Sequence, residues 1–225
     1  MSAIFVINIK EYISDEKRNH FEQIVSRETR EKIAKYKFRE DYLRSLYGEV
    51  LVRKIVSEKV GISPKKIVIR RNEFGKPYIE NISNIHFNIS HSGDWVACIV
   101  SDYDCGIDIE CIKDTDLKIA ERFFHEEECA ALFNKNDKLN YFFELWTLKE
   151  SYVKYKGKGL HIPLGSFSII EKNEKYEVHP ETENLVFTQY DCEEEYKIAA
   201  CTLDKIEQIK RISVDDIAEE WRLLM

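Results

Sequence analysis

Two apolar segments in the middle of the chain are joined by a very short connection. Trp95–Val100 and Cys105–Ile109 are mostly apolar, and only the four residues SDYD separate them. A parallel crossover needs about a dozen residues or more, so a connection this short excludes one. The pattern therefore predicts an antiparallel β-hairpin at 95–109, around which the rest of the fold has to be arranged.

The second apolar segment leads into two acids, Asp108 and Glu110. Alternate residues of a strand point to the same face, so the two carboxylates project together while Ile107 and Ile109 face the core. Neighbouring carboxylates repel, and burying them is costly unless a cation lies between them. Ligation by oxygen alone suits Mg²⁺, which completes its coordination with water and phosphate oxygens. An exposed strand end with two hydrated acids is the alternative.

A polar segment, Ser90–Gly93, precedes the first apolar strand. Backbone amides in such a turn can point at an anion, His91 can donate to a phosphate, and Gly93 allows close approach of the backbone. A serine–histidine nucleophile pair is also possible in principle, although the spacing does not form a nucleophile elbow. A purely structural histidine is the simpler alternative.

A helix is predicted over the segment FFELWTLKESYVKYKGKGL. Trp146, Glu150 and Lys154 share a face at helical spacing. Lys149 lies beside them in the sequence, so an acid and two ammonium groups are expected at neighbouring positions. The alternative is an ordinary surface ion pair between Glu150 and Lys154, worth only a few tenths of a kcal/mol.

The rest of the chain runs through helices and then strands, twice, without a Pro- or Gly-rich linker. Ser14 is expected to cap the first helix, and Gly61 and Gly157 to end two longer ones. One helix is expected at 116–133, and strands follow Gly159. Because regular βαβ alternation is lacking, the predicted class is α+β.

The charge balance restricts the possible partners. The 225 residues carry a formal net charge of −7, which argues against a nucleic-acid-binding protein. No run of about 18 apolar residues occurs, and the N-terminus does not read as a signal peptide, so we expect a cytoplasmic protein without a membrane partner. Positive charge is nevertheless clustered, which predicts a local anion site or a solvated helix face. The cluster contains Arg27, Arg30, Lys32, Lys35, Lys37, Arg39 and Arg44.

Four motifs, in this order and spacing, are together more specific than any one of them: FGKPYI, FNISHSGDWV, GIDIE and FFELWTLKESYVKYKGKGL. The chain resembles the 4′-phosphopantetheinyl transferase family, in particular its long, monomeric, surfactin-synthetase-activating type. The resemblance implies a pseudo-dimer of two similar α+β halves with the active site in the cleft between them. We expect these halves to span 1–103 and 104–225.

The resemblance also implies an activity. Members of the family transfer the 4′-phosphopantetheine arm of coenzyme A to a serine hydroxyl of an apo carrier protein and release adenosine 3′,5′-bisphosphate. The expected cofactor is Mg²⁺, and the expected partners are peptidyl, acyl or aryl carrier proteins. This type favours secondary metabolism, such as nonribosomal peptide, polyketide and antibiotic synthesis.

Matching positions supply the expected site residues. Asp108, Glu110 and Glu150 correspond to the metal ligands. Lys154 is expected to stabilise charge on the transferred phosphate, and it forms the expected catalytic set together with Glu150 and Glu128. The implied coenzyme A contacts are Lys32, Arg44, Ser45, Lys76, Ser90 and His91.

The resemblance further implies a base and a docking surface. The base that takes the proton of the carrier serine aligns with Glu128, but the adjacent Glu126 and Glu127 leave the choice open. The carrier is expected to bind over CIKDTDLKIAERFF. Three apolar side chains of this segment either form the docking face or pack inside, namely Ile112, Leu117 and Phe123.

Two rival functions use the same residues. A catalytically silent protein of this fold would bind coenzyme A and leave the carrier unmodified. A Mg²⁺-dependent phosphodiesterase would use water as the nucleophile and release phosphopantetheine. The intact set of Asp108, Glu110 and Glu150 favours the transferase over the silent protein, because binding alone does not require all three acids.

Overall fold

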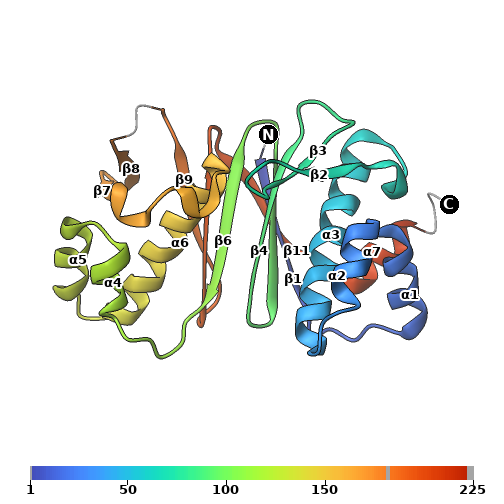
Figure 1. Cartoon of the computed structure of the whole chain (residues 1–225), viewed down its shortest axis with the longest axis horizontal. Helices are drawn as coiled ribbons and strands as arrows, with labels where there is room; N and C mark the ends of the chain where they lie inside the picture. Colours follow the sequence, from blue (N-terminus) through green and yellow to red (C-terminus); the bar gives the residue numbers. More distant parts are fainter. Residues whose placement is uncertain (1, 181–182, 222–225) are drawn as a thin grey trace.

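The computed structural model describes residues 2–180 and 183–221, which form four layers (Figure 1). Two sheets lie against each other in the middle of the molecule, and helices cover the outer face of each. The helices of the N-terminal half lie on one side of this double sheet, and the helices α4, α5 and α6 of the C-terminal half lie on the other.

A four-stranded sheet in the order β11–β1–β5–β4 organises the N-terminal half. β1 is antiparallel to β5 and parallel to β11, and β5 is antiparallel to β4. The strands are β1 (Ser2–Asn8), β4 (His86–Ser92), β5 (Trp95–Ser101) and β11 (Ile206–Arg211). The helices are α1 (Asp15–Ile24), α2 (Arg27–Ile33), α3 (Arg39–Val60) and α7 (Val214–Trp221). A smaller unit comprises the 3₁₀ helix η1 (Pro64–Lys66), β2 (Ile69–Arg71) and β3 (Pro77–Ile79).

A three-stranded antiparallel sheet in the order β6–β10–β9 organises the C-terminal half. Its strands are β6 (Cys105–Cys111), β9 (Val186–Glu193) and β10 (Tyr196–Thr202). The helices are α4 (Ile119–Phe123), α5 (Glu126–Phe133) and α6 (Lys138–Lys156), followed by the 3₁₀ turns η2 (Gly159–His161) and η3 (Leu164–Ser166). The hairpin of β7 (Ser168–Lys172) and β8 (Lys175–His179) completes this half.

The core between the two sheets explains why the central strands are so apolar. Trp95, Ala97 and Ile99 of β5 point toward the second sheet, whereas Val96 and Cys98 point toward the helices of their own half. Both faces of β5 are therefore buried, and a strand buried on both faces has a continuous apolar sequence. The buried members of the central core are Ile4, Val6, Trp95, Ala97, Ile99, Cys105, Ile107, Ile109, Tyr196, Ile198, Ala200 and Ile206.

The predicted hairpin at 95–109 is wrong. β5 pairs with β1 and β4, whereas β6 pairs with β10, so the two strands belong to different sheets. Their side chains meet face to face in the central core. The short connection carries the chain from one sheet to the sheet that faces it, and the hairpin lies one strand earlier, between β4 and β5. Gly93, with φ +52°, stands in that turn.

The halves 1–103 and 104–225 stay a prediction, and the last described elements contact the first half. β11 pairs with β1, and α7 places Val214 and Ile217 in the core of the N-terminal half. The chain therefore returns to the first half after β10. β11 covers the edge of β1, which would otherwise present unpaired backbone groups.

Three helix ends are confirmed and one helix is not. The Ser14 hydroxyl accepts from the backbone of α1, and Gly61 and Gly157 end α3 and α6 at φ +68° and +66°. The single helix predicted at 116–133 is two helices. Phe124 is extended between α4 and α5, and the His125 N–H donates to the Glu128 carboxylate at 2.8 Å. Within the described part of the chain, no helix combines the length and apolar character needed to span a membrane.

Candidate active site

The candidate site lies where the edge strands of the two facing sheets, β4 and β6, approach each other (Figure 1). The two strands belong to different sheets and are joined here through side chains. The backbone N–H of Ile107 donates to Asn88 Oδ1 at 2.9 Å, and that of Cys111 donates to Ser92 Oγ at 3.1 Å. Ser90 lies between them on the same face of β4. We call this row, Asn88, Ser90 and Ser92, the polar seam.

Asp108 is the central acid of the site and is only 3% exposed. Its Oδ1 accepts from Ser90 Oγ at 2.8 Å and from Lys154 Nζ at 2.6 Å. Lys154 Nζ also donates to Ser90 Oγ at 2.8 Å, so the three groups form a closed triangle. Asp108 Oδ2 is buried and has no hydrogen-bond partner among the described residues. A buried carboxylate oxygen without a partner is rare and indicates a position that can accept a ligand.

The other two predicted metal ligands lie near Asp108. Glu110 accepts from Ser92 Oγ at 2.8 Å. Burial, and next the negative charge of Asp108, raise the pKa of Glu110 and of Glu150. Glu110 shares one face of β6 with Asp108, and α6, which carries Glu150, packs against that strand.

We tested whether these acids suit a metal ion. Within residues 2–180 and 183–221, no three His, Cys, Asp or Glu side chains are already gathered as a metal site. The donor set nevertheless fits Mg²⁺, because Asp108, Glu110 and Glu150 offer only oxygen and Asp108 Oδ2 is without a partner.

A glycine lets α6 approach the site. A Cβ on Gly106 would lie 2.0 Å from the Ser151 carbonyl oxygen and 2.3 Å from the Tyr155 nitrogen. Any side chain at this position would therefore push α6 away from β6. The direct contact of helix and strand brings Glu150 and Lys154 next to β6.

Lys76 lies at the junction of the two halves. Its ammonium donates to the carbonyl of Cys105 at 3.0 Å and to that of Tyr155 at 3.1 Å. Burial lowers its pKa. Two of its three N–H groups are therefore used between the halves, and the third has no hydrogen-bond acceptor among the described residues.

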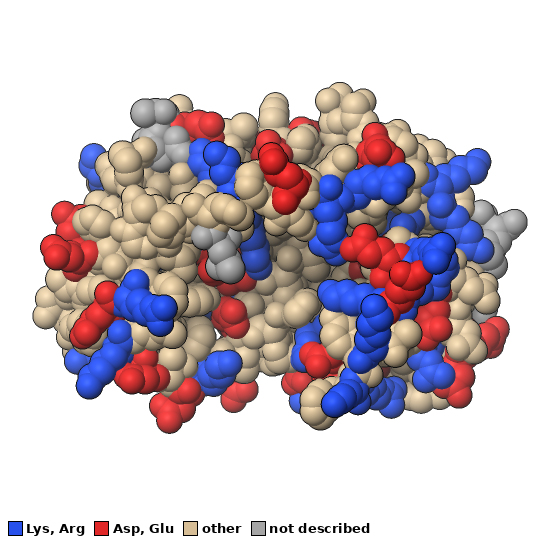
Figure 2. Space-filling model, in the orientation of Figure 1, with Lys and Arg blue, Asp and Glu red and all other residues tan. Residues whose placement is uncertain are grey.

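A basic face adjoins the site on the N-terminal half. Figure 2 shows lysine and arginine side chains gathered over this half, where α2 and the start of α3 lie. Lys32 is exposed, and its ammonium lies 5.8 Å from the centre of the Tyr36 ring. Ser45 Oγ donates to the Tyr36 hydroxyl at 3.2 Å. Arg44 pairs with Asp41 at 2.6 Å and donates to the carbonyl oxygen of the β4–β5 turn at 2.7 Å.

His91 joins this basic face to the site. It is an exposed residue of β4 and follows Ser90. Desolvation of the ring by its surroundings, and next the positive charge of Arg44, lower its pKa. An anion bound between His91 and Arg44 would oppose this effect and favour the protonated ring.

Glu128, the predicted base, is enclosed by hydrogen-bond donors in the C-terminal half. Glu128 is buried in the C-terminal half and accepts from Lys149 Nζ at 2.8 and 2.6 Å. The backbone N–H groups of His125 and Ile169 donate to it as well, at 2.8 and 2.7 Å. Its two oxygens thus accept four hydrogen bonds from three donor groups, and its role as the base stays a prediction. Its helix, α5, lies at the outer end of this half, away from β6 (Figure 1).

The structure also separates two residues that the sequence suggested would act together. Lys149 is fully buried and pairs with Glu128, whereas Lys154 faces Asp108. The predicted polar segment Ser90–Gly93 included Ser92 but not Asn88, although the alternating polar positions of FNISHS pointed to it.

The segment expected to dock a carrier follows β6. Its apolar residues Ile112, Leu117 and Phe123 are partly buried against the core of the C-terminal half. Ile119 of α4 is 38% exposed. The docking role of this segment remains a prediction.

Comparisons with known proteins identify the family of this chain. The family model described as "4′-phosphopantetheinyl transferase, N-terminal" matches residues 14–103, and that of the 4′-phosphopantetheinyl transferase superfamily matches 104–201. The 4′-phosphopantetheinyl transferase gsp of Aneurinibacillus migulanus is 42% identical over 82% of this chain and 79% of its own. The 4′-phosphopantetheinyl transferase Sfp of Bacillus subtilis (strain 168) is 36% identical over 95% and 99%.

Among solved structures, the holo-[acyl-carrier-protein] synthase of Thermotoga maritima aligns with a TM-score of 0.40 and 21% identity, covering 46% of this chain and 64% of that one. The matches to curated relatives extend through both halves at 36 to 42% identity. This chain therefore belongs to the 4′-phosphopantetheinyl transferase family and is a transferase of the Sfp type.

Proposed function

We propose that this enzyme transfers the 4′-phosphopantetheine arm of coenzyme A to a serine hydroxyl of an apo carrier protein of the peptidyl, acyl or aryl class. The serine oxygen forms a bond to the β-phosphorus, the bond from that phosphorus to the bridging oxygen breaks, and adenosine 3′,5′-bisphosphate leaves. The observation that carries the proposal is the buried Asp108, with one oxygen lacking a partner, beside a basic face.

Asp108, Glu110 and Glu150 would hold Mg²⁺ through carboxylate oxygens. Such an ion supplies charge stabilisation to phosphate oxygens during transfer. Asp108 then keeps its contacts with Ser90 and Lys154, which hold its carboxylate in one orientation.

Lys154 is proposed to stabilise negative charge that develops on the transferred phosphate. Its ammonium lies 2.6 Å from Asp108 Oδ1 and 2.8 Å from Ser90 Oγ, so it is already oriented before substrate arrives. Preorganised charge of this kind contributes strongly to catalysis, because no reorganisation is needed in the transition state.

The phosphates of coenzyme A are proposed to bind along the basic face. Lys32, Arg44 and His91 offer positive or ionisable groups there, and Ser45 and Ser90 offer hydroxyls. The remaining N–H of Lys76 reaches the same junction. Glu150, on the helix that packs against the strand carrying Asp108, is proposed to accept the proton of the carrier serine.

The test is the intact mass of an apo peptidyl carrier protein after incubation with this enzyme, coenzyme A and Mg²⁺, with an EDTA control. The expected result is a mass gain of one phosphopantetheine arm that EDTA prevents. Binding of coenzyme A without a mass gain, also with a fatty-acid carrier, would indicate a silent binding protein. Free phosphopantetheine without carrier would indicate the phosphodiesterase.

A further inference from the structure

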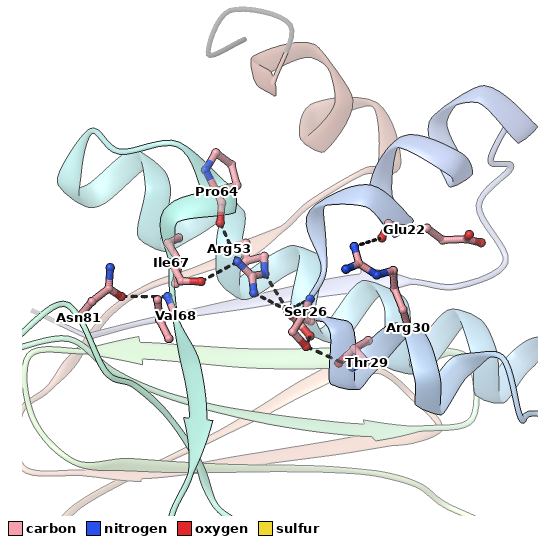
Figure 3. Close-up of polar contacts among 10 residues, drawn as sticks. Glu22, Ser26, Thr29, Arg30, Arg53, Pro64, Ile67, Val68 and Asn81 are labelled. Atoms are coloured by element: carbon pink, nitrogen blue, oxygen red, sulfur yellow. Dashed lines mark hydrogen bonds and ion pairs between the residues drawn. The ribbon is translucent and has the colours of Figure 1, made fainter.

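A charged pair is buried in the middle of α3, away from the candidate active site. Arg53 is 3% exposed and Glu49 is 8% exposed. Arg53 Nε donates to Glu49 Oε1 at 2.7 Å, and the second terminal nitrogen lies 2.7 Å from the same oxygen. Arg53 Nη1 donates to the carbonyl oxygens of Pro64 and Ile67 at 2.7 and 2.9 Å (Figure 3). Burial of this guanidinium is therefore compensated by contacts in two directions.

Glu49 connects the pair to α2. Its Oε1 accepts from the backbone N–H of Ser26 at 2.6 Å, and its Oε2 accepts from Ser26 Oγ at 2.9 Å. Ser26 is the N-cap of α2, because its Oγ accepts from the Thr29 N–H at 3.1 Å. The start of α2 is thus fixed to α3 by a buried carboxylate.

Other polar contacts of α2 with its neighbours are at the surface. Arg30 donates to the carbonyl of Glu22 at 3.3 Å (Figure 3), and Glu28 pairs with Arg71 at 2.7 Å. Exposed contacts of this kind contribute little energy. The contact of Ser26 with the buried Glu49 carboxylate is partly buried and is therefore the stronger restraint on the direction of α2.

The carbonyl contacts of Arg53 connect the pair to the segment that carries Lys76. Pro64 and Ile67 belong to η1 and the residue after it, directly before β2. The next residue, Val68, donates its N–H to Asn81 Oδ1 at 2.9 Å, and so ties this segment to the chain beyond β3 (Figure 3). Lys76 lies in the connection between β2 and β3.

From these contacts we propose that Arg53 is a positioning residue for coenzyme A binding. Its guanidinium fixes three segments relative to one another, and each carries a residue of the proposed coenzyme A site: α2 with Lys32, α3 with Arg44, and the β2–β3 segment with Lys76. Arg53 itself is buried and touches no substrate. The inference rests on the proposed function, because it assigns those three residues to coenzyme A.

The planar guanidinium is essential to this role. Its nitrogens reach the Glu49 carboxylate and two carbonyls at the same time, in fixed directions. A lysine keeps the charge but offers one small ammonium that cannot occupy all these directions. Arg53→Lys therefore separates the geometry of the contacts from the charge.

The experiment compares steady-state kinetics of Arg53→Lys and wild type, at a temperature at which both are folded. We expect the KM for coenzyme A to rise about tenfold, with kcat and the KM for the carrier protein changing less than about twofold. Calorimetric titration with coenzyme A alone should show the same loss of affinity.

Lys54→Met is the matched control. Lys54 is the next residue of α3, is also buried, and also pairs with an acid one turn away, Glu58. We expect it to lower the melting temperature and to leave the KM for coenzyme A within about twofold of wild type. If Arg53→Lys does not fold, Ser26→Ala tests the same contact from the α2 side, with an expected rise in KM of about threefold.

Equal effects of Arg53→Lys and Lys54→Met on the KM for coenzyme A would overturn the inference. The inference would also be overturned if kcat and carrier affinity fell as much as coenzyme A affinity. An unchanged KM for coenzyme A in both Arg53→Lys and Ser26→Ala would overturn it too. If the wild-type protein binds coenzyme A but modifies no carrier, the proposed transfer is contradicted. The calorimetric test of Arg53 still applies in that case. If the wild-type protein does not bind coenzyme A, both the proposed function and the positioning role of Arg53 are contradicted.

Discussion

Two lysines of α6 illustrate how one helix can serve structure on one side and chemistry on the other. Lys149 is fully buried and lies 2.6 Å from Glu128, whereas Lys154 is partly exposed and lies 2.6 Å from Asp108. Five residues at about 100° each rotate a side chain by roughly 140° around the helix axis. The two ammonium groups therefore face different parts of the molecule.

The two pairs differ in how completely the acid is satisfied. Glu128 accepts four hydrogen bonds from three donor groups on three segments, and both of its oxygens are used. Asp108 accepts through Oδ1 only, and its buried Oδ2 has no partner among the described residues. The first arrangement stabilises the fold. The second leaves an acceptor position that a ligand can use, and this contrast separates a structural acid from a candidate ligand.

The largest effect is expected at Asp108. Asp108→Asn removes the negative charge and should lower transfer to the carrier about a thousandfold or more, because the proposed ion and Lys154 both depend on that charge. The melting temperature should change little. Mass spectrometry of the carrier and a thermal melt check both parts, and full activity in this variant would remove the proposed metal site.

Glu128→Ala should have the opposite profile. It leaves Lys149 buried without its acid, so the free energy of unfolding should fall by about 3–5 kcal/mol. The folded fraction should keep its kcat. Urea denaturation and kinetics at low temperature measure these quantities, with the exposed Glu127→Ala as the control. If Glu128→Ala abolished turnover but kept its stability, the role of Glu128 as base would be restored.

A smaller effect is expected in the polar seam. Asn88→Ala removes the acceptor for the buried N–H of Ile107 and should cost about 1–3 kcal/mol. Because the strand that carries Asp108 loses a restraint, activity should fall as well, but much less than in Asp108→Asn. Hydrogen exchange should become faster in β6. Unchanged exchange there would show that the seam does not hold the two sheets together.

The smallest effect concerns pH. Burial is the main cause that raises the pKa of Glu110 in the folded protein, and the negative charge of Asp108 is the second. The folded state therefore binds a proton at Glu110 more tightly than the unfolded chain does. The resulting cost to stability is absent below the unfolded pKa of about 4.3 and is fully present above the raised pKa.

Glu110→Gln should therefore melt about 1–2 °C higher than wild type at pH 7 in EDTA. The difference should disappear near pH 4. Differential scanning calorimetry at both values measures it, with Glu127→Gln as the control. A larger difference at pH 4 than at pH 7 would contradict the assigned direction of the pKa.

Local signals identified many of the individual elements correctly. The caps at Ser14, Gly61 and Gly157 were predicted because a capping residue acts on its own helix. The common face of Asp108 and Glu110 follows from the alternation along one strand, and the placement of Lys154 beside Asp108 agrees with the motif order. The class α+β and the family were identified in the same way, from local pattern and motif spacing.

The errors share one physical cause. The connection at 102–104 is short enough to form a hairpin, and it can equally join two facing sheets. The choice between these two arrangements depends on which strands pair with the edges of β5. β1, which pairs with β5, and β10, which pairs with β6, are far from these strands in sequence, so no local signal indicates the pairing. The return of 206–221 to the N-terminal half was missed for the same reason.

The sequence by itself determined the helices, the apolar strands, the family and the set of acids and cations available for chemistry. Only the tertiary structure decided what those charges do, because the role of a charged group depends on its burial and on the donors that reach it from distant segments. Glu128 and Asp108 are both acids paired to lysines of α6. Long-range packing surrounds the first with three donor groups, and it leaves one oxygen of the second without a partner among the described residues.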